Sequence, residues 1–299
     1  MPKWTRREFL RTAAAGIGTL TGAPFALASE TGKTKRTATD IVTLGRSELK
    51  VTRLAFGTGS NGGSVQRALG QKEFTKIIRY AYDKGVRFFD TADNYGEMHE
   101  MLAAALEGLP RESYAIQTKM KWSPGHVPKE EIDRFRKELK TDYFDSFLLH
   151  CLQTSNWQEE LKPLMDGLQE AKENKWIRSH GASCHGLKPL KAMAGCSWLD
   201  VALLRVNHDG THMDGPTGEW AEKGSHDEAV GEIKKIHDSG TGVIGMKLIG
   251  NGDFTDPAQR DASLRFAMGL DCVDAIVIGF KSTAEIDEAI ERMNKHLNA

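Results

Sequence analysis

Four side chains of the sequence could together move a proton onto an oxygen atom: Asp90, Tyr95, Lys119 and His150. A phenol such as that of Tyr95 is a weak acid, because its free pKa is about 10. A neighbouring ammonium would lower that pKa, and a carboxylate would hold the ammonium charged and aimed. An imidazole could hydrogen-bond to the same oxygen and orient it. The four residue types therefore suit acid catalysis at an oxygen that gains negative charge.

Each of these residues taken singly has a simpler explanation. Asp90 could cap a turn, and Tyr95 could be half-buried packing. Lys119 could be solvated, and His150 could be a hydrogen-bonded histidine at the end of a strand. The chemistry therefore depends on whether the surrounding elements bring the four side chains together.

Short β-like apolar runs alternate with amphipathic helical patterns from Val51 onward. The runs are Leu54–Phe56, Val86–Phe89, Tyr114–Gln117, Phe144–Leu149, Ile177–Ala182, Val201–Val206, Val243–Met246 and Ala275–Ile278. Eight strands alternating with helices over about 250 residues predict an α/β fold, a single-domain (β/α)8 TIM barrel. A doubly wound sheet would share this alternation. In a barrel, catalytic residues follow the carboxyl ends of strands, and the four side chains follow the second, third and fourth runs.

Several residues mark the expected helix boundaries. Pro128 opens one helix, and Gly108 follows another. Ser225 with Glu228, and Ser282 with Glu285, match the capping-box spacing.

The composition fits a soluble globular protein of 299 residues, with 39% hydrophobic and 27% charged residues. The formal net charge of −1 gives no basic footprint for nucleic acid. Residues 1–28 carry a net charge of +3, so the remainder carries −4. A basic leader before an acidic body indicates a removable targeting segment.

The leader resembles a twin-arginine (Tat) signal peptide. Arg6-Arg7 precede Phe9-Leu10, an uncharged stretch follows, and Ala26-Leu27-Ala28 forms a small-x-small cleavage site. A short N-terminal helix or a membrane anchor is the alternative, but the stretch is shorter than the ~20 residues of a spanning helix. We expect a signal peptide over 1–28, a polar linker over 29–40 and the barrel over 41–299. The resemblance implies the Tat translocon as a partner, a periplasmic location and no stable membrane anchor.

The segment Gly85–Gly96, which reads GVRFFDTADNYG, resembles the characteristic motif of the aldo-keto reductase family. Thr118-Lys119 and Leu148-Leu149-His150 follow in the family's order, and the resemblance extends from about Ile41 to Ile290. It implies hydride transfer between NADP (or NAD) and a carbonyl or alcohol, an aldehyde, ketone or sugar. Asp90, Tyr95, Lys119 and His150 would be the catalytic residues, with Tyr95 as general acid. A barrel that binds cofactor or a small ligand without turnover is the alternative.

The resemblance also implies a set of cofactor-binding residues. They are Gly57, Thr58, Asp90, Ser183, Lys247, Gly279, Lys281 and Glu285. Two positions depart from the family. Its members hold the nicotinamide amide with an Asn and a Gln, and this sequence has Cys184 and Leu203 at those positions. Family habit favours NADP, whereas a Glu285 carboxylate facing the ribose would favour NAD; Glu285 could instead only cap its helix.

The stretch Gly57–Gly62 matches the dinucleotide-binding pattern G-x-G-x-x-G. That pattern requires a helix that begins at its last glycine, whereas the helical periodicity here starts near Lys72. We interpret the stretch as a flexible loop over the barrel mouth.

Several other polar and aromatic residues have open roles, and no metal site is expected. Cys151 and Cys184 could pair, or bind metal with His150 or His185, or simply pack or line the pocket. His208 and His212 are expected to be solvated loop residues, with substrate contact as the alternative. By position, Trp122, Trp157, His185 and Trp220 are candidates for the pocket wall.

Overall fold

The computed structural model describes residues 35–123, 125–219 and 222–299. The predicted signal peptide, most of the predicted linker and Trp220 lie outside these residues. Within the described ranges, no helix combines the length and the apolar character that a membrane crossing needs.

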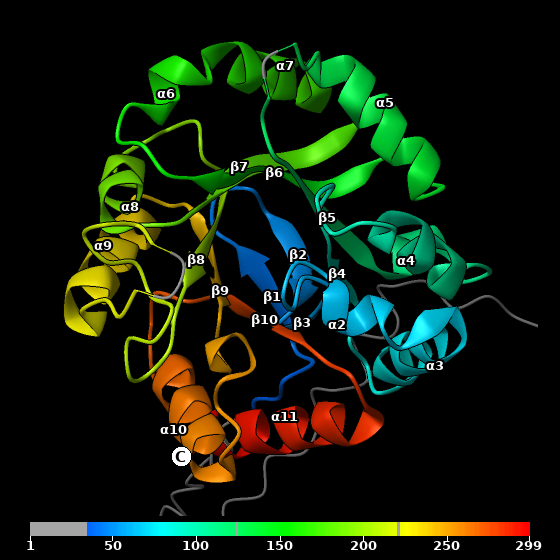
Figure 1. Ribbon diagram of the computed structural model, residues 1–299, viewed down its shortest axis with the longest axis vertical. Helices are drawn as coiled ribbons and strands as arrows, with labels where there is room; N and C mark the ends of the chain where they lie inside the picture. Colours follow the sequence, from blue (N-terminus) through cyan, green and yellow to red (C-terminus); the bar gives the residue numbers. More distant parts are fainter. Residues whose placement is uncertain (1–34, 124, 220–221) are drawn as a thin grey trace, which may run out of the picture. The chain divides into compact units, whose positions relative to one another are not determined.

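Eight parallel strands close into a barrel in the order β10-β3-β4-β5-β6-β7-β8-β9 (Figure 1). They are β3 (Leu54–Gly57), β4 (Phe88–Asp90), β5 (Ala115–Met120), β6 (Phe144–Leu152), β7 (Ile177–Cys184), β8 (Val201–Arg205), β9 (Gly242–Met246) and β10 (Ala275–Gly279). The predicted single-domain (β/α)8 barrel is thereby confirmed. A doubly wound sheet is excluded, because it would leave two open edges.

Helices surround the strands (Figure 1). They are α2 (Ser64–Arg67), α3 (Gly70–Asp83), α4 (Met98–Leu106), α5 (Pro128–Glu138), α6 (Trp157–Glu160), α7 (Lys162–Glu173), α8 (Leu187–Met193), α9 (His226–Asp238), α10 (Pro257–Met268) and α11 (Thr283–His296), with 3-10 turns η1 (Arg111–Ser113) and η2 (Gly250–Gly252). Pro128 opens α5, and the Ser225 and Ser282 side chains cap α9 and α11, as predicted.

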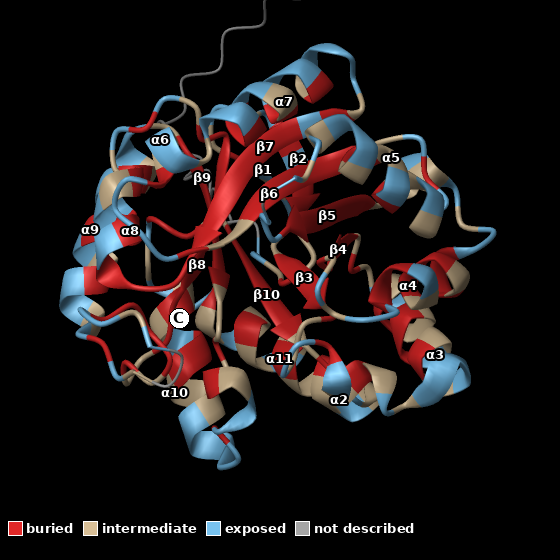
Figure 2. Cartoon of the chain, turned by 45° about the horizontal axis from the view of Figure 1, so that its top comes forward, coloured by how far each residue is buried: buried red, intermediate tan, exposed pale blue. Residues whose placement is uncertain are grey.

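The apolar side chains fill two separate spaces. One cluster lies between the strands and the helices, and it includes Phe56, Phe89, Leu204 and Ile276. The other lies inside the barrel, and it includes Phe88, Leu148, Leu203 and Val277. Figure 2 shows the barrel strands mostly buried and the helices exposed on their outer faces. Alternate residues of each strand therefore face the barrel interior, which fixes the side on which each polar residue lies.

A β-hairpin that the sequence analysis did not resolve packs against the barrel. It consists of β1 (Ile41–Leu44) and β2 (Leu49–Thr52), paired antiparallel. Leu44, Leu49 and Val51 belong to the cluster inside the barrel. Gly45 lies so close to the backbone of Gly242, which begins β9, that a side chain on Gly45 would overlap it. The hairpin therefore closes the end where the strands begin, which leaves the carboxyl ends of the strands for a site.

Two expectations about local structure are corrected. The end of the predicted linker packs on the barrel, because Ala38 is buried and its carbonyl accepts the Leu54 N–H at 2.8 Å. The Ala38 N–H also donates to Asn294 of α11 at 2.7 Å. In addition, the short helix α2 begins two residues after Gly62, well before the predicted start near Lys72.

Candidate active site

A buried ion pair joins the ends of the neighbouring strands β4 and β5. Lys119 Nζ lies 2.7 Å from Asp90 Oδ1 and donates a second hydrogen bond to the Thr91 carbonyl at 2.6 Å. Gln117, two residues before Lys119 on the same face of β5, donates to Asp90 Oδ1 at 2.8 Å. Asp90 is 4% exposed and Lys119 is 1% exposed. Because both charges are desolvated, loss of either partner would leave an uncompensated buried charge, which typically costs about 3–5 kcal/mol.

Tyr95 lies in the loop between β4 and α4, directly above this ion pair. Lys119 Nζ is 5.3 Å from the centre of the Tyr95 ring. The His150 ring is 5.7 Å from the Tyr95 ring and nearly perpendicular to it. The structure thus brings all four predicted catalytic side chains to one rim of the barrel. The Lys119 ammonium donates to Asp90 and Thr91 rather than to the phenol.

The expected acidification of the phenol is wrong for this structure. Burial raises the pKa of Tyr95 well above its usual value, and the negative charge of Asp90 raises it further. The positive charge of Lys119 is offset by the ion pair with Asp90, and burial lowers the pKa of Lys119 as well. Tyr95 therefore holds its proton throughout the neutral pH range.

His150 lies at an irregularity near the end of β6. The pairing of β6 with β7 shifts register between Leu149 and Leu152, and Cys151 has a φ of 63°. Such bulges bend a strand and re-aim its side chains, and they are common beside active sites. Burial, followed by the charge of Lys119, lowers the pKa of His150 well below its usual value. Within the described ranges, its buried Nδ1 has no hydrogen-bond partner.

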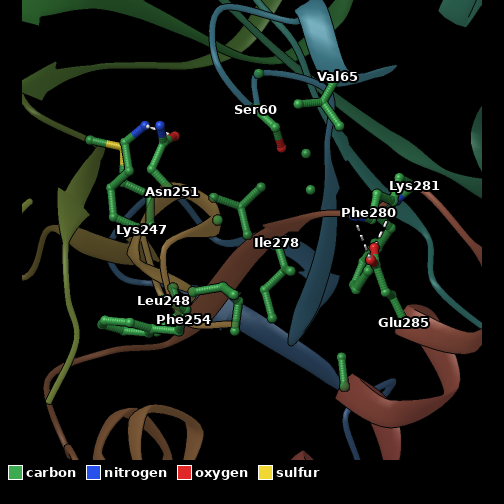
Figure 3. A pocket seen from close by; sticks show the side chains of 18 of the residues that line it. Ser60, Val65, Lys247, Leu248, Asn251, Phe254, Ile278, Phe280, Lys281 and Glu285 are labelled. Carbon is green, nitrogen blue, oxygen red and sulfur yellow. Dashed lines mark hydrogen bonds and ion pairs between the residues drawn. The ribbon is translucent and has the colours of Figure 1, made fainter. Parts of the chain in front are cut away.

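A cleft of about 580 Å³ begins at Asp90, Tyr95 and Lys119 and extends to Glu288 and Arg292 of α11. Figure 3 shows side chains that line it. Six of the predicted cofactor residues line this cleft: Gly57, Asp90, Lys247, Gly279, Lys281 and Glu285. Leu203, where the family has Gln, also lines it, so an apolar side chain faces the cleft at that position.

Thr58 and Ser183, the other two predicted cofactor residues, are buried beside the cleft and make contacts within the protein. The Thr58 N–H and hydroxyl both donate to the Asp90 carbonyl, at 2.9 and 3.1 Å. The Ser183 hydroxyl accepts the Cys151 N–H at 3.0 Å. Thr58 thus fixes the backbone of a predicted catalytic residue. Cys184, the next residue of β7, packs in the outer cluster and not toward the barrel interior.

Sequence reasoning missed Asn61 and Asn251, which together with the predicted Lys247 connect the two loops beside the cleft. Lys247 Nζ donates to Asn251 Oδ1 at 2.9 Å, and the two side chains point toward one another in Figure 3. Asn251 Nδ2 in turn donates to Asn61 Oδ1 at 2.6 Å, across 190 positions of sequence. Both asparagines have the left-handed backbone conformation that Asn tolerates, so their residue type is the one signal that the sequence offered for them. Burial, then the charges of Arg205 and Lys119, lower the pKa of Lys247 to about 7.

Charged residues of α10 and α11 line the far end of the cleft. Glu288 accepts hydrogen bonds from both Arg260 and Arg292, each at 2.9 Å. The Glu285 carboxylate accepts the Lys281 N–H at 2.9 Å, and its own N–H donates to the Ser282 hydroxyl. The Ser282 hydroxyl therefore caps α11 through the Glu285 N–H, while the Glu285 carboxylate holds the residue before the cap and also lines the cleft.

The candidates for the pocket wall and the cysteines differ in their burial and contacts. Trp157 is fully buried in the core and does not form a pocket wall, whereas Trp122 is 41% exposed. Cys151 Sγ lies 3.1 Å from His185 Nδ1. All four cysteines, which lie within the described residues, are free thiols.

Of the two loop histidines after β8, His212 is buried, contrary to expectation, and His208 is half-buried. His212 is 6% exposed and lies 2.8 Å from Asp253. The His208 ring packs edge-on against Phe254, with 5.2 Å between ring centres. Both histidines therefore connect the loop after β8 to the loop after β9.

An ion pair that the sequence analysis did not predict lies buried near the mouth. Arg205 Nε of β8 is 3.7 Å from Asp214 Oδ1, and both side chains are fully buried. Asp214 Oδ1 also accepts the Gly186 N–H at 2.7 Å. Burial, partly opposed by Arg205, raises the pKa of Asp214 to about 6. Arg205 could have been suspected as a charged residue on an inward-facing position of an apolar strand.

Comparison of this sequence with known proteins agrees with the barrel that the structure shows. The model of the Aldo/keto reductase family matches residues 53–265, more than half of the chain. A relative from Glycine max that is named as an aldo-keto reductase is 31% identical over 171 residues, which are 51% of this chain and 49% of that protein. The chain thus spans about half the length of this relative.

Two further similarities cover more of the chain. Versiconal hemiacetal acetate reductase of Aspergillus parasiticus is 25% identical over 74% of this chain and 71% of its own length. The holo structure of an aldo-keto reductase from Bacillus halodurans superposes with a TM-score of 0.66 at 18% identity, over 87% of this chain and 95% of that one, and supports the fold. Together with the barrel and the match over residues 53–265, these findings show that the chain belongs to the aldo/keto reductase family.

Proposed function

We propose that this protein transfers a hydride between NADP (or NAD) and a carbonyl or alcohol substrate, an aldehyde, ketone or sugar, with Tyr95 as general acid. One observation carries the proposal. The side chains of Asp90, Tyr95, Lys119 and His150 meet at one rim, and three of them line the end of a long cleft.

The cleft suits a dinucleotide. Its volume of about 580 Å³ lies within the range of ligand pockets, roughly 300–1,000 Å³. Gly57 and Gly279 leave its wall without side chains at the junction of β3 and β10. A nicotinamide cofactor, when bound, supplies the hydride. Lys247 would offer a cation to its pyrophosphate, and Lys281 and Glu285 would face its adenosine.

The chain's own residues would manage the proton and the developing charge. The Tyr95 hydroxyl donates its proton to the carbonyl oxygen as that oxygen gains negative charge. His150, which is neutral because burial lowers its pKa, donates an N–H to the same oxygen. Lys119, held by Asp90, places a positive charge near the phenolate that forms.

Tyr95→Phe tests this assignment. It removes the proton donor and leaves the ring packing in place, so kcat for aldehyde reduction should fall by about 10²–10⁴-fold. The Kd of NADPH or NADH, from fluorescence titration, should stay unchanged. Trp122→Phe, outside the proposed tetrad, is the control for general effects of an aromatic substitution near the mouth. If the wild type binds cofactor but shows no hydride transfer on a panel of aldehydes, ketones and sugars, the alternative of a binding protein holds.

The choice between NADP and NAD depends on the charges at the far end of the cleft. Arg260 and Arg292 share Glu288, and the Glu285 carboxylate would repel a 2′-phosphate. We propose NADP with only weak discrimination against NAD, because each cation here already has a carboxylate nearby.

Glu285→Arg should raise the affinity for NADPH relative to NADH by about tenfold, because one close charge interaction contributes about 1–2 kcal/mol at such a site. Both Kd values are measured by fluorescence titration. Glu285→Gln is the matched control, since it keeps an acceptor for the Lys281 N–H and should give a smaller change. An unchanged NADPH/NADH ratio in Glu285→Arg would reject the discrimination role.

We also propose export through the Tat translocon to the periplasm, supported by the leader over residues 1–28. Free nicotinamide cofactor is scarce outside the cytoplasm, so the exported enzyme would carry bound cofactor and recycle it on one substrate or on a pair. Retention at a nanomolar Kd requires about 12 kcal/mol of binding free energy. Mass analysis of protein purified from the periplasm tests this, and protein without nicotinamide would argue against it.

A further inference from the structure

The glycine-rich stretch after β3, which the dinucleotide pattern singled out, lies against Tyr95. A Cβ placed on Gly59 would lie 2.5 Å from Tyr95 Cζ and 2.6 Å from the Tyr95 hydroxyl oxygen. A Cβ on Gly63 would lie 2.8 Å from the Tyr95 carbonyl oxygen and 2.9 Å from its Cβ. Ordinary contacts of a Cβ begin near 3.4 Å, so neither position leaves room for a side chain.

Several contacts fix this stretch relative to the catalytic rim. Thr58, the residue before Gly59, is tied to the Asp90 carbonyl through both its N–H and its hydroxyl. Arg67, at the end of α2, donates hydrogen bonds to the carbonyls of Tyr95 and Gly62. The stretch is therefore held against Tyr95 by hydrogen bonds to the same backbone that carries Asp90.

We propose that Gly59, together with Gly63, positions the Tyr95 hydroxyl for proton transfer by allowing the phenol to rest directly on the backbone. Both are positioning residues that act through Tyr95. The inference rests on the proposed function of Tyr95 as general acid. It also gives Gly59 a role that does not involve a pyrophosphate turn.

Gly59→Ala is the decisive substitution, because Gly59 has no positive φ and its main conflict is with the phenol. The added methyl group must displace the hydroxyl by about 1 Å, and a misplacement of that size costs about 100-fold in rate. We expect kcat to fall about 100-fold while the Kd of the cofactor, from fluorescence titration, stays unchanged. A cofactor Kd that rises in step with the loss of kcat would overturn the proposal, since Gly59 also lines the cleft.

The matched control is Gly62→Asn, three residues along the same stretch. Gly62 has a φ of 63° and no atom within 4 Å of its would-be Cβ. Asn tolerates this backbone conformation, so kcat should remain at the wild-type value. A loss equal to that of Gly59→Ala would show that the whole stretch is merely sensitive to substitution and would overturn the proposal.

A thermal-unfolding cycle tests the contact without any reference to activity. Gly59→Ala should lower Tm in the wild-type background but not in the Tyr95→Ala background, where the ring is absent. An equal loss of Tm in both backgrounds would overturn the proposed contact. If the cycle shows coupling while Tyr95→Phe retains full activity, the contact between Gly59 and Tyr95 exists but Tyr95 is not the general acid. Failure of the contact and failure of the proposed function are therefore distinguishable.

Discussion

At the scale of single residues, burial decides the behaviour of the ionisable groups around the cleft. It keeps the proton on Tyr95, keeps His150 neutral and lowers the pKa of Lys247 to about 7. The pKa of Lys247 therefore lies in the physiological range. Its charge is present below pH 7 and is lost as the pH rises through that value.

Cofactor affinity should therefore depend on pH through Lys247. If this ammonium binds the pyrophosphate, the Kd of NADPH should be nearly constant below pH 7 and should rise by up to tenfold per pH unit above it. Fluorescence titrations between pH 6 and pH 8.5 measure this. Lys247→Met should bind more weakly at pH 6 and lose the pH dependence; a pH dependence that survives in this variant would mean that another group titrates.

At the scale of elements, the β1–β2 hairpin and the barrel share one core. Leu44 of β1 is fully buried among inward-facing residues of the strands, whereas Ile41 at the other end of β1 is 60% exposed. The hairpin thus contributes to stability at the end of the barrel opposite to the site. This separation should allow stability and catalysis to be changed independently.

Leu44→Ala should lower the free energy of unfolding by about 3 kcal/mol, because it leaves a cavity in a buried cluster. Urea denaturation measures the change. Ile41→Ala on the same strand is the matched control, and it should change stability by less than about 0.5 kcal/mol. Equal effects of the two substitutions on stability would contradict the role of the hairpin in closing that end of the barrel. We expect kcat at 25 °C to be unchanged in both variants.

At the scale of the whole molecule, the described body is a closed barrel whose packing already includes residues 36–40. Tat transport carries folded proteins, so the proposed Tat signal would be compatible with a barrel that binds its cofactor before transport. The location and the cofactor supply are therefore linked parts of one proposal.

Replacement of both arginines of the leader, Arg6→Lys with Arg7→Lys, should abolish export, because the paired guanidinium groups are the recognised feature of a Tat signal. Immunoblots of periplasmic and cytoplasmic fractions measure this, and Lys3→Arg serves as a control outside the pair. Undiminished periplasmic protein in the double variant would reject the Tat route.

The sequence by itself determined the order of the strands and helices and the identities of the four catalytic candidates, and the structure showed that the sheet closes into a barrel. Short apolar runs that alternate with amphipathic helical patterns report which segments must be buried, so all eight strands were predicted at nearly their observed positions. The motif around Asp90 and Tyr95 fixed the order of the candidates along the chain.

Only the tertiary structure decided how these residues behave. Gly59 meets Tyr95, Asn61 meets Asn251, and Arg205 meets Asp214 across loops whose paths no local pattern encodes. Burial depends on every element packed around a group, which is why the raised pKa of Tyr95 ran against the expectation drawn from Lys119 alone. Sequence periodicity is a local property, whereas contacts and desolvation arise when distant segments pack together.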